Sequence, residues 1–578
     1  GSSGWHRKGA AAKSSDVARQ RASVRHCSGV SRGSQPASQP AAASRRKGAS
    51  ETMQVLPENT ELPAYTREEV ARHNTPEDLW CIIDDRVYDL TRFAKLHPGG
   101  KAALVDVAGQ DATVAFYGLH RKEVLGKTGK RLVIGTVVGA TPRPEAKPGA
   151  RSVVPYGEQS AFMPGWKSAY YTESHARFQE AVRACLDREV APHAARMEEA
   201  NEDPSPELFR TLGAAGVLAA RVGPGPWQQQ LAKSGVTLPG GLRPEAMDHF
   251  HELIAHQEVA RLGTPGVTDG LGSGMVIGLP PVLHFGRPAL AARVGGEVLR
   301  GERRICLAIS EAQAGSDVAN ITTTARLSPC GRFYLVDGLK KWITNGDFCD
   351  YFVTAVRTGG PGIGGISLLL VERSEGLTTR KVKTSYSGSA GTCWVFYDNV
   401  KVPVENLLGK ENGGFKCIMA NFNHERWLIC CMTNRSSRLV LEECFKWANQ
   451  RRVFGSELIH QPVIRNKLAH MVSMVESAEN WLENITFQMN NMDYKTQSEK
   501  LAGPIALLKL FCTRTQNSVV DEACQIFGGR ALTRTGMGRI VEGAQRAVKF
   551  SAILGGSEEI MADLGIKQTM RNFPDARL

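Results

Sequence analysis

The sequence has no apolar run that approaches the roughly 18 residues a membrane-spanning helix requires. Its 13 cysteines form no CxxC pair and show no regular spacing. That pattern excludes a disulfide framework or a zinc site of paired cysteines, and it favours a reducing compartment. With 42% hydrophobic and 22% charged residues, the composition is that of a globular protein. The length of 578 residues allows about three or four domains.

Excess positive charge is missing from most of the chain. The net charge is +13, but residues 1–50 hold ten Lys or Arg and a single acid, Asp16, a net of +9. The remaining 528 residues therefore carry only +4, too little to favour binding to nucleic acid. Residues 1–60 also have few large apolar side chains, so we expect a disordered basic tail there.

Residues 61–138 have the pattern of a compact α+β unit. Thr66 and Glu69 are spaced as a capping box, which predicts a short helix. The runs 79–83 and 86–90 predict two strands joined by a turn at 84–85. These elements lie close enough in sequence to form one small domain.

Two histidines in this unit lie close in sequence to short runs rich in small residues. His97 precedes Pro98 and two glycines, and His120 comes after the run AGQDAT. Two histidines that face each other across an apolar pocket can ligate a haem iron, whereas two unrelated loop histidines would show the same spacing. HPGG, AGQDAT and the second histidine resemble the cytochrome b5 domain over nearly the whole unit. The resemblance implies haem b with His97 and His120 as iron ligands, one residue closer than in the commonest b5 form.

The rest of the chain changes character three times. Residues 139–165 carry five prolines and predict a linker. Residues 166–305 have mostly helical periodicity, 306–415 are short β-rich runs broken by Gly and Asp, and 416–578 return to the helical period. The histidines at 249, 251 and 256 lack a carboxylate pattern typical of a metal site, so we expect none there.

The stretch from Ile305 to Gly346 holds candidate binding residues. An apolar run leads into a loop with Ser310, Gly315 and Ser316, where backbone N–H groups and hydroxyls suit a pyrophosphate. Trp342 lies two residues before Thr344, so in a regular strand the two side chains share a face. An aromatic plane beside a hydroxyl suits a flat heterocycle. A Ser-rich turn and an ordinary buried Trp would give the same residues.

SEAQAGSDVA and KKWITNG in this stretch resemble the two flavin-binding signatures of the acyl-CoA dehydrogenase family. The resemblance extends over roughly residues 166–570. It implies an all-α N-terminal domain (166–305), a β-barrel or sandwich middle domain (306–415) and a C-terminal four-helix bundle (416–578). It also implies FAD and a homodimer or homotetramer, because some of the flavin contacts cross subunits in this family. The implied flavin contacts are Ile309, Ser310, Gly315, Ser316, Trp342, Thr344, Arg451, Phe454, Gln525, Gly529, Ser557 and Glu559, and the implied substrate contacts are Ser316 and Arg426.

Removal of two hydrogens from an acyl thioester needs a base for the α proton and donors for the carbonyl oxygen. One family position for the base matches Gly555, which has no carboxylate. The other matches Glu425 in NHERW. With Gly555 lacking a side chain, its N–H becomes a candidate donor to the thioester carbonyl.

The helical periodicity of this segment independently supports Glu425 as the candidate base. Its place on an apolar face raises a carboxyl pKa, as a base near neutral pH requires, although an ion pair with an arginine would also explain it. The face is formed by Ile418, Phe422, Ile429 and Met432.

The sequence therefore predicts an acyl-CoA dehydrogenase of fatty-acid or branched acyl-CoA β-oxidation. It would form trans-2-enoyl-CoA and pass electrons to the fused haem or to an electron-transferring flavoprotein. An acyl-CoA oxidase or nitroalkane-oxidase-like flavoenzyme is one alternative, and a nucleic-acid-binding protein of the flavin fold is another. Ala576-Arg577-Leu578 resembles a peroxisomal address. The basic, Ser-rich first residues also describe a transit peptide and leave a mitochondrial location as the alternative.

Overall fold

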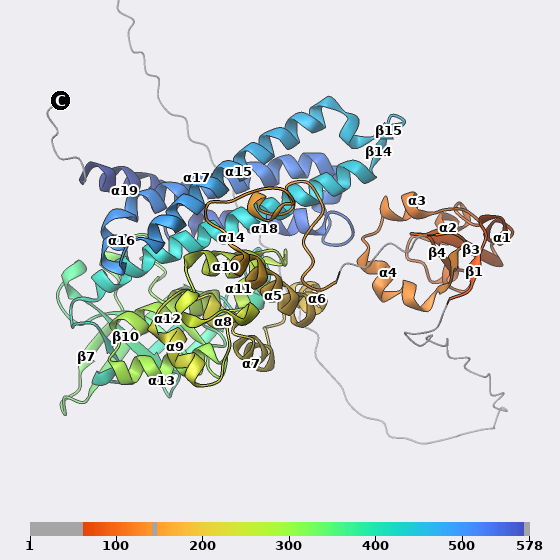
Figure 1. Ribbon diagram of the computed structural model, residues 1–578. Coiled ribbons are helices and arrows are strands. Elements are labelled where there is room, and N and C mark those ends of the chain that lie inside the picture. Colours follow the sequence, from red (N-terminus) through yellow and green to blue (C-terminus); the bar gives the residue numbers. More distant parts are fainter. Residues whose placement is uncertain (1–61, 141–146, 572–578) are drawn as a thin grey trace, which may run out of the picture. The chain divides into compact units, whose positions relative to one another are not determined.

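The computed structural model describes residues 62–140 and 147–571 (Figure 1). The basic tail expected at 1–60 and the terminal Ala576-Arg577-Leu578 lie outside the described residues.

Residues 62–140 fold as the expected α+β unit around a five-stranded sheet of order β1-β5-β4-β3-β2. The capping box is confirmed, because Thr66 Oγ1 accepts from Glu69 N–H at 3.1 Å and Glu69 Oε2 accepts from Thr66 N–H at 2.7 Å. Asp84 and Asp85 have φ of 51° and 61°, which closes the tight hairpin. The elements are β1 (Ala64–Tyr65), α1 (Arg67–Ala71), β2 (Asn74–Thr75), β3 (Asp78–Ile83), β4 (Arg86–Asp89), α2 (Ala102–Val105), α3 (Thr113–Tyr117), α4 (Glu123–Lys127) and β5 (Val133–Val137).

A helical region follows, as the periodicity predicts. Its best-defined start is that of α10, where the Asp248 carboxylate accepts from the N–H groups of Phe250 and His251 at 3.0 and 3.1 Å. The helices are α5 (Glu173–Glu189), α6 (Ala191–Ala200), α7 (Pro206–Ala214), α8 (Val217–Ala220), α9 (Pro226–Lys233), α10 (His249–Ala260), α11 (Pro265–Gly270), α12 (Ser273–Phe285) and α13 (Pro288–Leu299).

The middle region is one sheet of order β11-β12-β8-β7-β9-β10-β13, with β6 paired in parallel to β9. Its two longest strands, β8 and β12, pair antiparallel with two register shifts. The strands are β6 (Ile305–Ala308), β7 (Thr324–Leu327), β8 (Phe333–Ile343), β9 (Tyr351–Arg357), β10 (Ile366–Glu372), β11 (Leu377–Lys381), β12 (Cys393–Pro403) and β13 (Leu407–Leu408).

The C-terminal region is a helical bundle built around α14, which runs for 37 residues. Trp427 and Trp447 of α14 are almost fully buried, and Trp427 Nε1–H donates to Thr486 Oγ1 of α15 at 3.0 Å. Truncation of a buried Trp of this kind costs about 3–5 kcal/mol, so these rings hold the bundle together. The elements are α14 (Gly414–Gln450), β14 (Arg452–Val453), β15 (Ser456–Glu457), α15 (Pro462–Asn490), α16 (Tyr494–Lys500), α17 (Ala502–Phe527), α18 (Arg539–Ile553) and α19 (Glu558–Arg571).

The later part of the proline-rich segment 139–165 packs onto the helices rather than running free. Glu158 is buried and pairs with Arg183 of α5 at 2.6 Å. Gln159 Nε2 donates to Glu479 Oε1 of α15 at 2.7 Å. The residues that end the linker are therefore part of the helical core.

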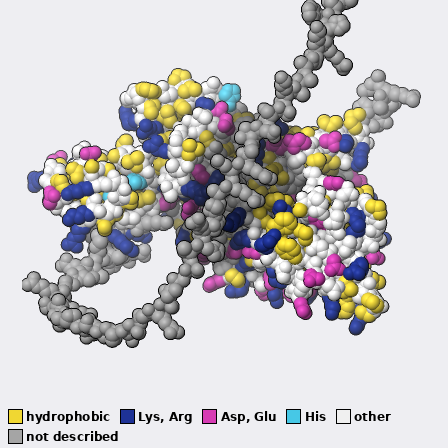
Figure 2. Space-filling model, turned by 180° about the vertical axis from the view of Figure 1, so that it is seen from behind, with side chains coloured by type: hydrophobic (Ala, Val, Ile, Leu, Met, Phe, Trp, Pro, Cys, Tyr) yellow, Lys and Arg dark blue, Asp and Glu magenta, His cyan; other side chains and the backbone are white. Residues whose placement is uncertain are grey.

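Surface charge is mixed over the described residues. On the face seen in Figure 2, Lys and Arg lie interspersed with Asp and Glu. Among the described residues, no helix is long and apolar enough to cross a bilayer.

Candidate active site

The first candidate loop leaves the sheet at the end of β6. Ile309 is buried, whereas Gly315 and Ser316 are exposed. Apart from its two chain neighbours, no described residue has a heavy atom within 4 Å of where a Cβ on Gly315 would stand. The loop therefore offers open backbone and a free hydroxyl, as an anionic ligand requires.

A buried ion pair joins the two candidate flavin segments. Lys340 Nζ lies 2.8 Å from Glu311 Oε1 and donates to the carbonyl of Ile309 at 2.9 Å. The same carboxylate accepts from Thr322 and Thr323. Burial alone would raise the pKa of Glu311, but Lys340 and these donors hold it down at about 2. Sequence reasoning missed this pair, because Glu311 looked like part of a surface loop.

The expected strand alternation between Trp342 and Thr344 is wrong. Trp342 has φ of 68°, in the left-handed region, beside a register shift between β8 and β12. A non-glycine residue in that region is strained and is often found at functional sites. Because of this bulge, the Trp342 ring is 52% exposed, while Thr344 is buried and lines a cavity. An exposed aromatic face beside a lining hydroxyl still suits a flat heterocycle.

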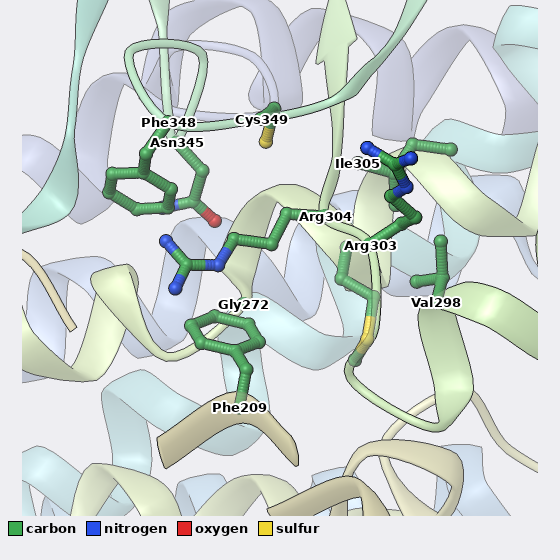
Figure 3. A pocket seen from close by; sticks show the side chains of 10 residues that line it. Phe209, Gly272, Val298, Arg303, Arg304, Ile305, Asn345, Phe348 and Cys349 are labelled. Carbon is green, nitrogen blue, oxygen red and sulfur yellow. The ribbon is translucent and has the colours of Figure 1, made fainter. Parts of the chain in front are cut away.

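Behind these segments, Arg304 forms a structural clamp. Its guanidinium lies between the rings of Phe209 and Phe348, 4.4 and 5.0 Å from their centroids (Figure 3). Its Nη2–H donates to the carbonyl of Pro204 at 3.0 Å. The Arg304 side chain fills the hollow there, so the hollow is not a binding site. Arg304 instead supports the start of β6 and the loop of Asn345.

Glu425 lies on α14 and opens into the same cavity as Thr344. It is 4% exposed, and its Oε2 has no hydrogen-bond partner among the described residues. Burial raises the pKa of Glu425 to about 7, against the opposing effects of Arg426, Lys509 and His424. A carboxyl with that pKa exists in both forms near neutral pH, which suits a general base. Glu425 is more deeply buried than the predicted apolar face alone would require, because α14 is enclosed on nearly all sides here.

Gly555, the other candidate position, faces Glu425 directly. A Cβ on Gly555 would lie 3.3 Å from Glu425 Oε1 and 2.8 Å from Ile429 Cδ1. Its φ of 64° favours glycine, and Arg426 Nε–H donates to its carbonyl at 2.9 Å. The two candidate base positions thus meet at one point, and Arg426, predicted to bind substrate, holds the Gly555 backbone.

The sequence did not predict two further features of this site. Lys509 of α17 is buried and donates to the carbonyl of Gly556 at 2.7 Å, and burial lowers its pKa to about 8. On the other side of α14, His424 Nε2 and His249 Nδ1 lie 2.6 and 2.8 Å from the buried Glu252. The Glu252 carboxylate raises the pKa of His424 against the effect of burial. Lys509 and His424 both lower the pKa of Glu425. Helical periodicity gives no sign of these contacts, because Lys509 comes from α17 and Glu252 from α10.

Ser557 and Glu559 follow Gly555 at the start of α19. Ser557 is partly exposed and Glu559 exposed. The neighbouring Glu558 is the structural residue, since it is buried and accepts from Thr513 Oγ1 at 2.9 Å. Ser557 Oγ accepts from the N–H of Ile560 at 3.4 Å, so this residue helps to start α19.

The remaining predicted flavin contacts gather at the opposite end of α14. Because the helix is continuous, Arg451 lies about 39 Å along it from Glu425. Phe454 there is 95% exposed, and Gln525 and Gly529 are exposed at the end of α17. Stacking of Trp447 on Phe527, with centroids 5.5 Å apart, places the two helix ends together. This second cluster is compatible with the predicted contact across subunits.

In the b5-like unit, His97 and His120 come together. Their ring centroids lie 5.9 Å apart, a separation that leaves room for a metal with bonds of about 2 Å to each ring. His97 Nδ1 lies 3.1 Å from the carbonyl of Gly100, which leaves Nε2 available as a ligand. A Cβ on Gly99 would lie 2.9 Å from His97 Cε1, so a larger residue there would displace the His97 ring.

Exposed apolar side chains close to these histidines in sequence support a flat apolar group between them. The residues present therefore fit a haem. These side chains are Leu96, Val114 and Leu119.

Among the described residues, one other set of side chains is spaced for a metal ion: His175, Asp248 and His251. Ordinary capping accounts for it. Asp248 caps α10, and His175 Nδ1 accepts from the N–H of Thr172 at 2.9 Å at the start of α5.

Comparisons with known proteins agree with this geometry. Family models match the acyl-CoA dehydrogenase N-terminal domain at residues 172–302, its middle domain at 306–400 and its C-terminal domain at 412–570. The cytochrome b5-like heme/steroid binding domain matches at 66–138.

Curated relatives and solved structures cover the same part of the chain. Acyl-CoA dehydrogenase apdG of Emericella nidulans is 38% identical over 73% of this chain and 96% of its own length. Acyl-CoA dehydrogenase AFT10-1 of Alternaria alternata is 38% identical over 73% and 97%. A putative acyl-CoA dehydrogenase structure from Mycobacterium smegmatis has a TM-score of 0.62 at 30% identity, covering 70% of this chain and 100% of that one. The chain therefore belongs to the acyl-CoA dehydrogenase family and carries a cytochrome b5-like domain at its N-terminal side.

Proposed function

We propose that this protein is an FAD-dependent acyl-CoA dehydrogenase that converts fatty or branched acyl-CoA to trans-2-enoyl-CoA. The observation that carries the proposal is the Glu425 carboxylate. It is buried, its Oε2 has no hydrogen-bond partner in residues 62–140 and 147–571, and it opens into a cavity that Thr344 of the flavin signature also lines. A base at this point can take an acidic α proton from one side of a bound substrate, while a hydride acceptor lies on the other side.

The residues of the chain supply binding and proton transfer. Glu425 takes the α proton on Oε2, and the raised pKa of Glu425 makes that transfer favourable near neutral pH. The N–H of Gly555, which faces this carboxylate, is the candidate donor to the thioester carbonyl. Leu428, Ile429 and Leu554 line the cavity and exclude water. When bound beside Trp342 and Thr344, FAD supplies the acceptor for the hydride from Cβ.

For the electrons, we propose exit through haem b in the b5-like domain. Support comes from the facing rings of His97 and His120 and from the apolar side chains near them. A haem with both axial positions filled by protein supplies a one-electron carrier. An electron-transferring flavoprotein is the external acceptor that competes with this route. Assembly through the Arg451 cluster and a peroxisomal location belong to the same proposal.

The test uses purified holoprotein under anaerobic conditions. Addition of an acyl-CoA is expected to bleach the flavin absorbance and then to reduce a b-type haem. A His97→Ala/His120→Ala variant should lose the haem signal and keep flavin reduction, because both histidines lie outside the cavity of Glu425.

Two outcomes would overturn parts of this account. No flavin reduction by any acyl-CoA would contradict the dehydrogenase activity. Rapid peroxide formation under air, with haem left oxidised, would instead indicate an oxidase.

A further inference from the structure

The cavity at Glu425 continues along α14, away from the base. It has a volume of about 100 Å³, room for several ordered waters or a narrow chain. Glu425, Ile429, Thr433 and Ser436 line it at helical spacing. Ser436 lies three helical turns beyond Glu425, so the lined face extends for about 16 Å.

The turn before α11 and helix α17 reach the same far end. A Cβ on Gly263 would lie 2.8 Å from Leu439 Cδ2, one turn beyond Ser436, so Thr264 stands at this end. On α17, Cys512 lies against Cys430 of α14, and Gln516 follows one turn later. The two helices run in parallel, because further along them Trp447 stacks on Phe527. Thr264 and Gln516 therefore meet the cavity beyond its apolar part.

The two ends of the cavity differ in chemistry. Near Glu425 the wall is apolar, with Leu428, Ile429 and Leu554. At the far end it is polar, with side chains of Thr264, Thr433, Ser436 and Gln516. A plain alkyl chain would match the apolar wall near Glu425 and leave the polar side chains at the far end without hydrogen bonds.

Two of the far polar groups lack a partner. Thr264 is 2% exposed and Gln516 6%, and neither Thr264 Oγ1 nor Gln516 Oε1 has a hydrogen bond among the described residues. A buried polar group without a partner is costly and rare, so a ligand or water is expected to reach both. Asp269 also lines the cavity, and within the described part of the chain its Oδ2 has no hydrogen-bond partner and no Lys or Arg lines the cavity. This charge pattern disfavours an anionic ligand.

The far end is also closed to a bulky group. Leu439 and Ile540, both 8% exposed, stand beside Gly263 there. The CoA moiety therefore does not leave at this end, and the acyl tail is the part of the substrate that enters it.

We propose that the substrate is an acyl-CoA whose chain carries an uncharged hydroxyl at or near its far end, bound by Thr264 and Gln516. This inference rests on the proposed dehydrogenase function. A hydroxyl both donates and accepts, so it satisfies the Thr264 hydroxyl and the Gln516 amide together. At a little over 1 Å per bond, a span of about 16 Å corresponds to roughly a dozen carbons.

The experiment compares four substrates of the holoenzyme: dodecanoyl-CoA, ω-hydroxydodecanoyl-CoA, hexanoyl-CoA and ω-hydroxyhexanoyl-CoA. The wild-type protein is expected to prefer ω-hydroxydodecanoyl-CoA over dodecanoyl-CoA about tenfold in kcat/KM, mostly through KM. The two hexanoyl substrates should not show this preference, because their hydroxyl does not reach the far end. Thr264→Val and Gln516→Leu should each bring the dodecanoyl ratio close to one.

Thr378→Val, on an exposed position of β11, is the matched control and should keep the wild-type ratio. Equal or better use of plain dodecanoyl-CoA, or a preference that survives both variants, would overturn the inference. Binding, read from the flavin spectrum of a Glu425→Gln holoenzyme, gives the same ratio without turnover. A protein that binds all four thioesters and oxidises none contradicts the proposed function, while the binding ratio still decides the role of Thr264 and Gln516.

Discussion

Two buried glutamates in this molecule have opposite environments. Glu311 and Glu425 are 1% and 4% exposed, and burial acts to raise the pKa of both carboxyls. The Glu311 carboxylate pairs with the Lys340 ammonium and accepts several hydrogen bonds, and these interactions hold its pKa at about 2. One oxygen of Glu425 has no partner in the part of the chain that the structure describes, and the pKa of Glu425 is raised to about 7.

The difference shows that partners, rather than burial, decide what a buried carboxylate does. A fully satisfied carboxylate is fixed as an anion and ties two segments of the β domain together. A carboxylate left partly unsatisfied beside a cavity is free to exchange a proton. Lys509 and His424 stand near Glu425 but hydrogen-bond to Gly556 and Glu252 instead.

The largest effect is expected from Glu425→Gln, which removes the base and keeps the shape. The rate of flavin reduction by acyl-CoA should fall by about 10²- to 10⁴-fold. FAD content and the unfolding midpoint should stay near those of the wild-type protein. Glu405→Gln, at an exposed position, should show no loss. Full activity in Glu425→Gln would remove Glu425 from the mechanism.

Lys340→Met breaks the pair at the other glutamate and leaves a buried charge alone. The free energy of unfolding should fall by about 3–5 kcal/mol, with weaker retention of FAD. Denaturant titration measures the first quantity and dialysis against FAD-free buffer the second. The exposed Lys401→Met should be neutral. A Glu311→Gln/Lys340→Met double variant should recover part of the loss, and no recovery would argue against an electrostatic cause.

Lys509→Met tests the environment of Glu425 with a smaller effect. The ammonium of Lys509 lowers the pKa of Glu425, so its removal should raise that pKa. At pH 6 less of the base is then ionised, and flavin reduction should slow by about two- to tenfold, with recovery at higher pH. Lys509→Arg keeps the charge and should behave like the wild-type protein. An equal loss at all pH values would indicate displacement of the Gly556 loop instead.

Much of the architecture follows from patterns that the sequence displays locally. The capping box at Thr66 and the alternation of helical and β-rich stretches depend on near neighbours along the chain. Glu425 could be identified because its motif and its apolar face both lie on one helix.

What could not be predicted arises from distant segments that meet in space. Lys340 of β8 pairs with Glu311 in the loop after β6, and Lys509 of α17 lies near the base on α14. The bulge at Trp342 comes from the register between β8 and β12, which no local period shows. The polar end of the cavity combines Thr264 and Gln516, whose separate sequences look unremarkable.

The central claim is that Glu425 is a base whose pKa lies near neutrality because its carboxylate is buried and incompletely paired. The most direct measurement is the rate of anaerobic flavin reduction by saturating acyl-CoA across a range of pH. The rate should rise with pH along a single acid limb with a midpoint of about 7, as Glu425 loses its proton. A rate that is flat through this range, or a midpoint near the ordinary pKa of about 4.3 for glutamate, would contradict the account.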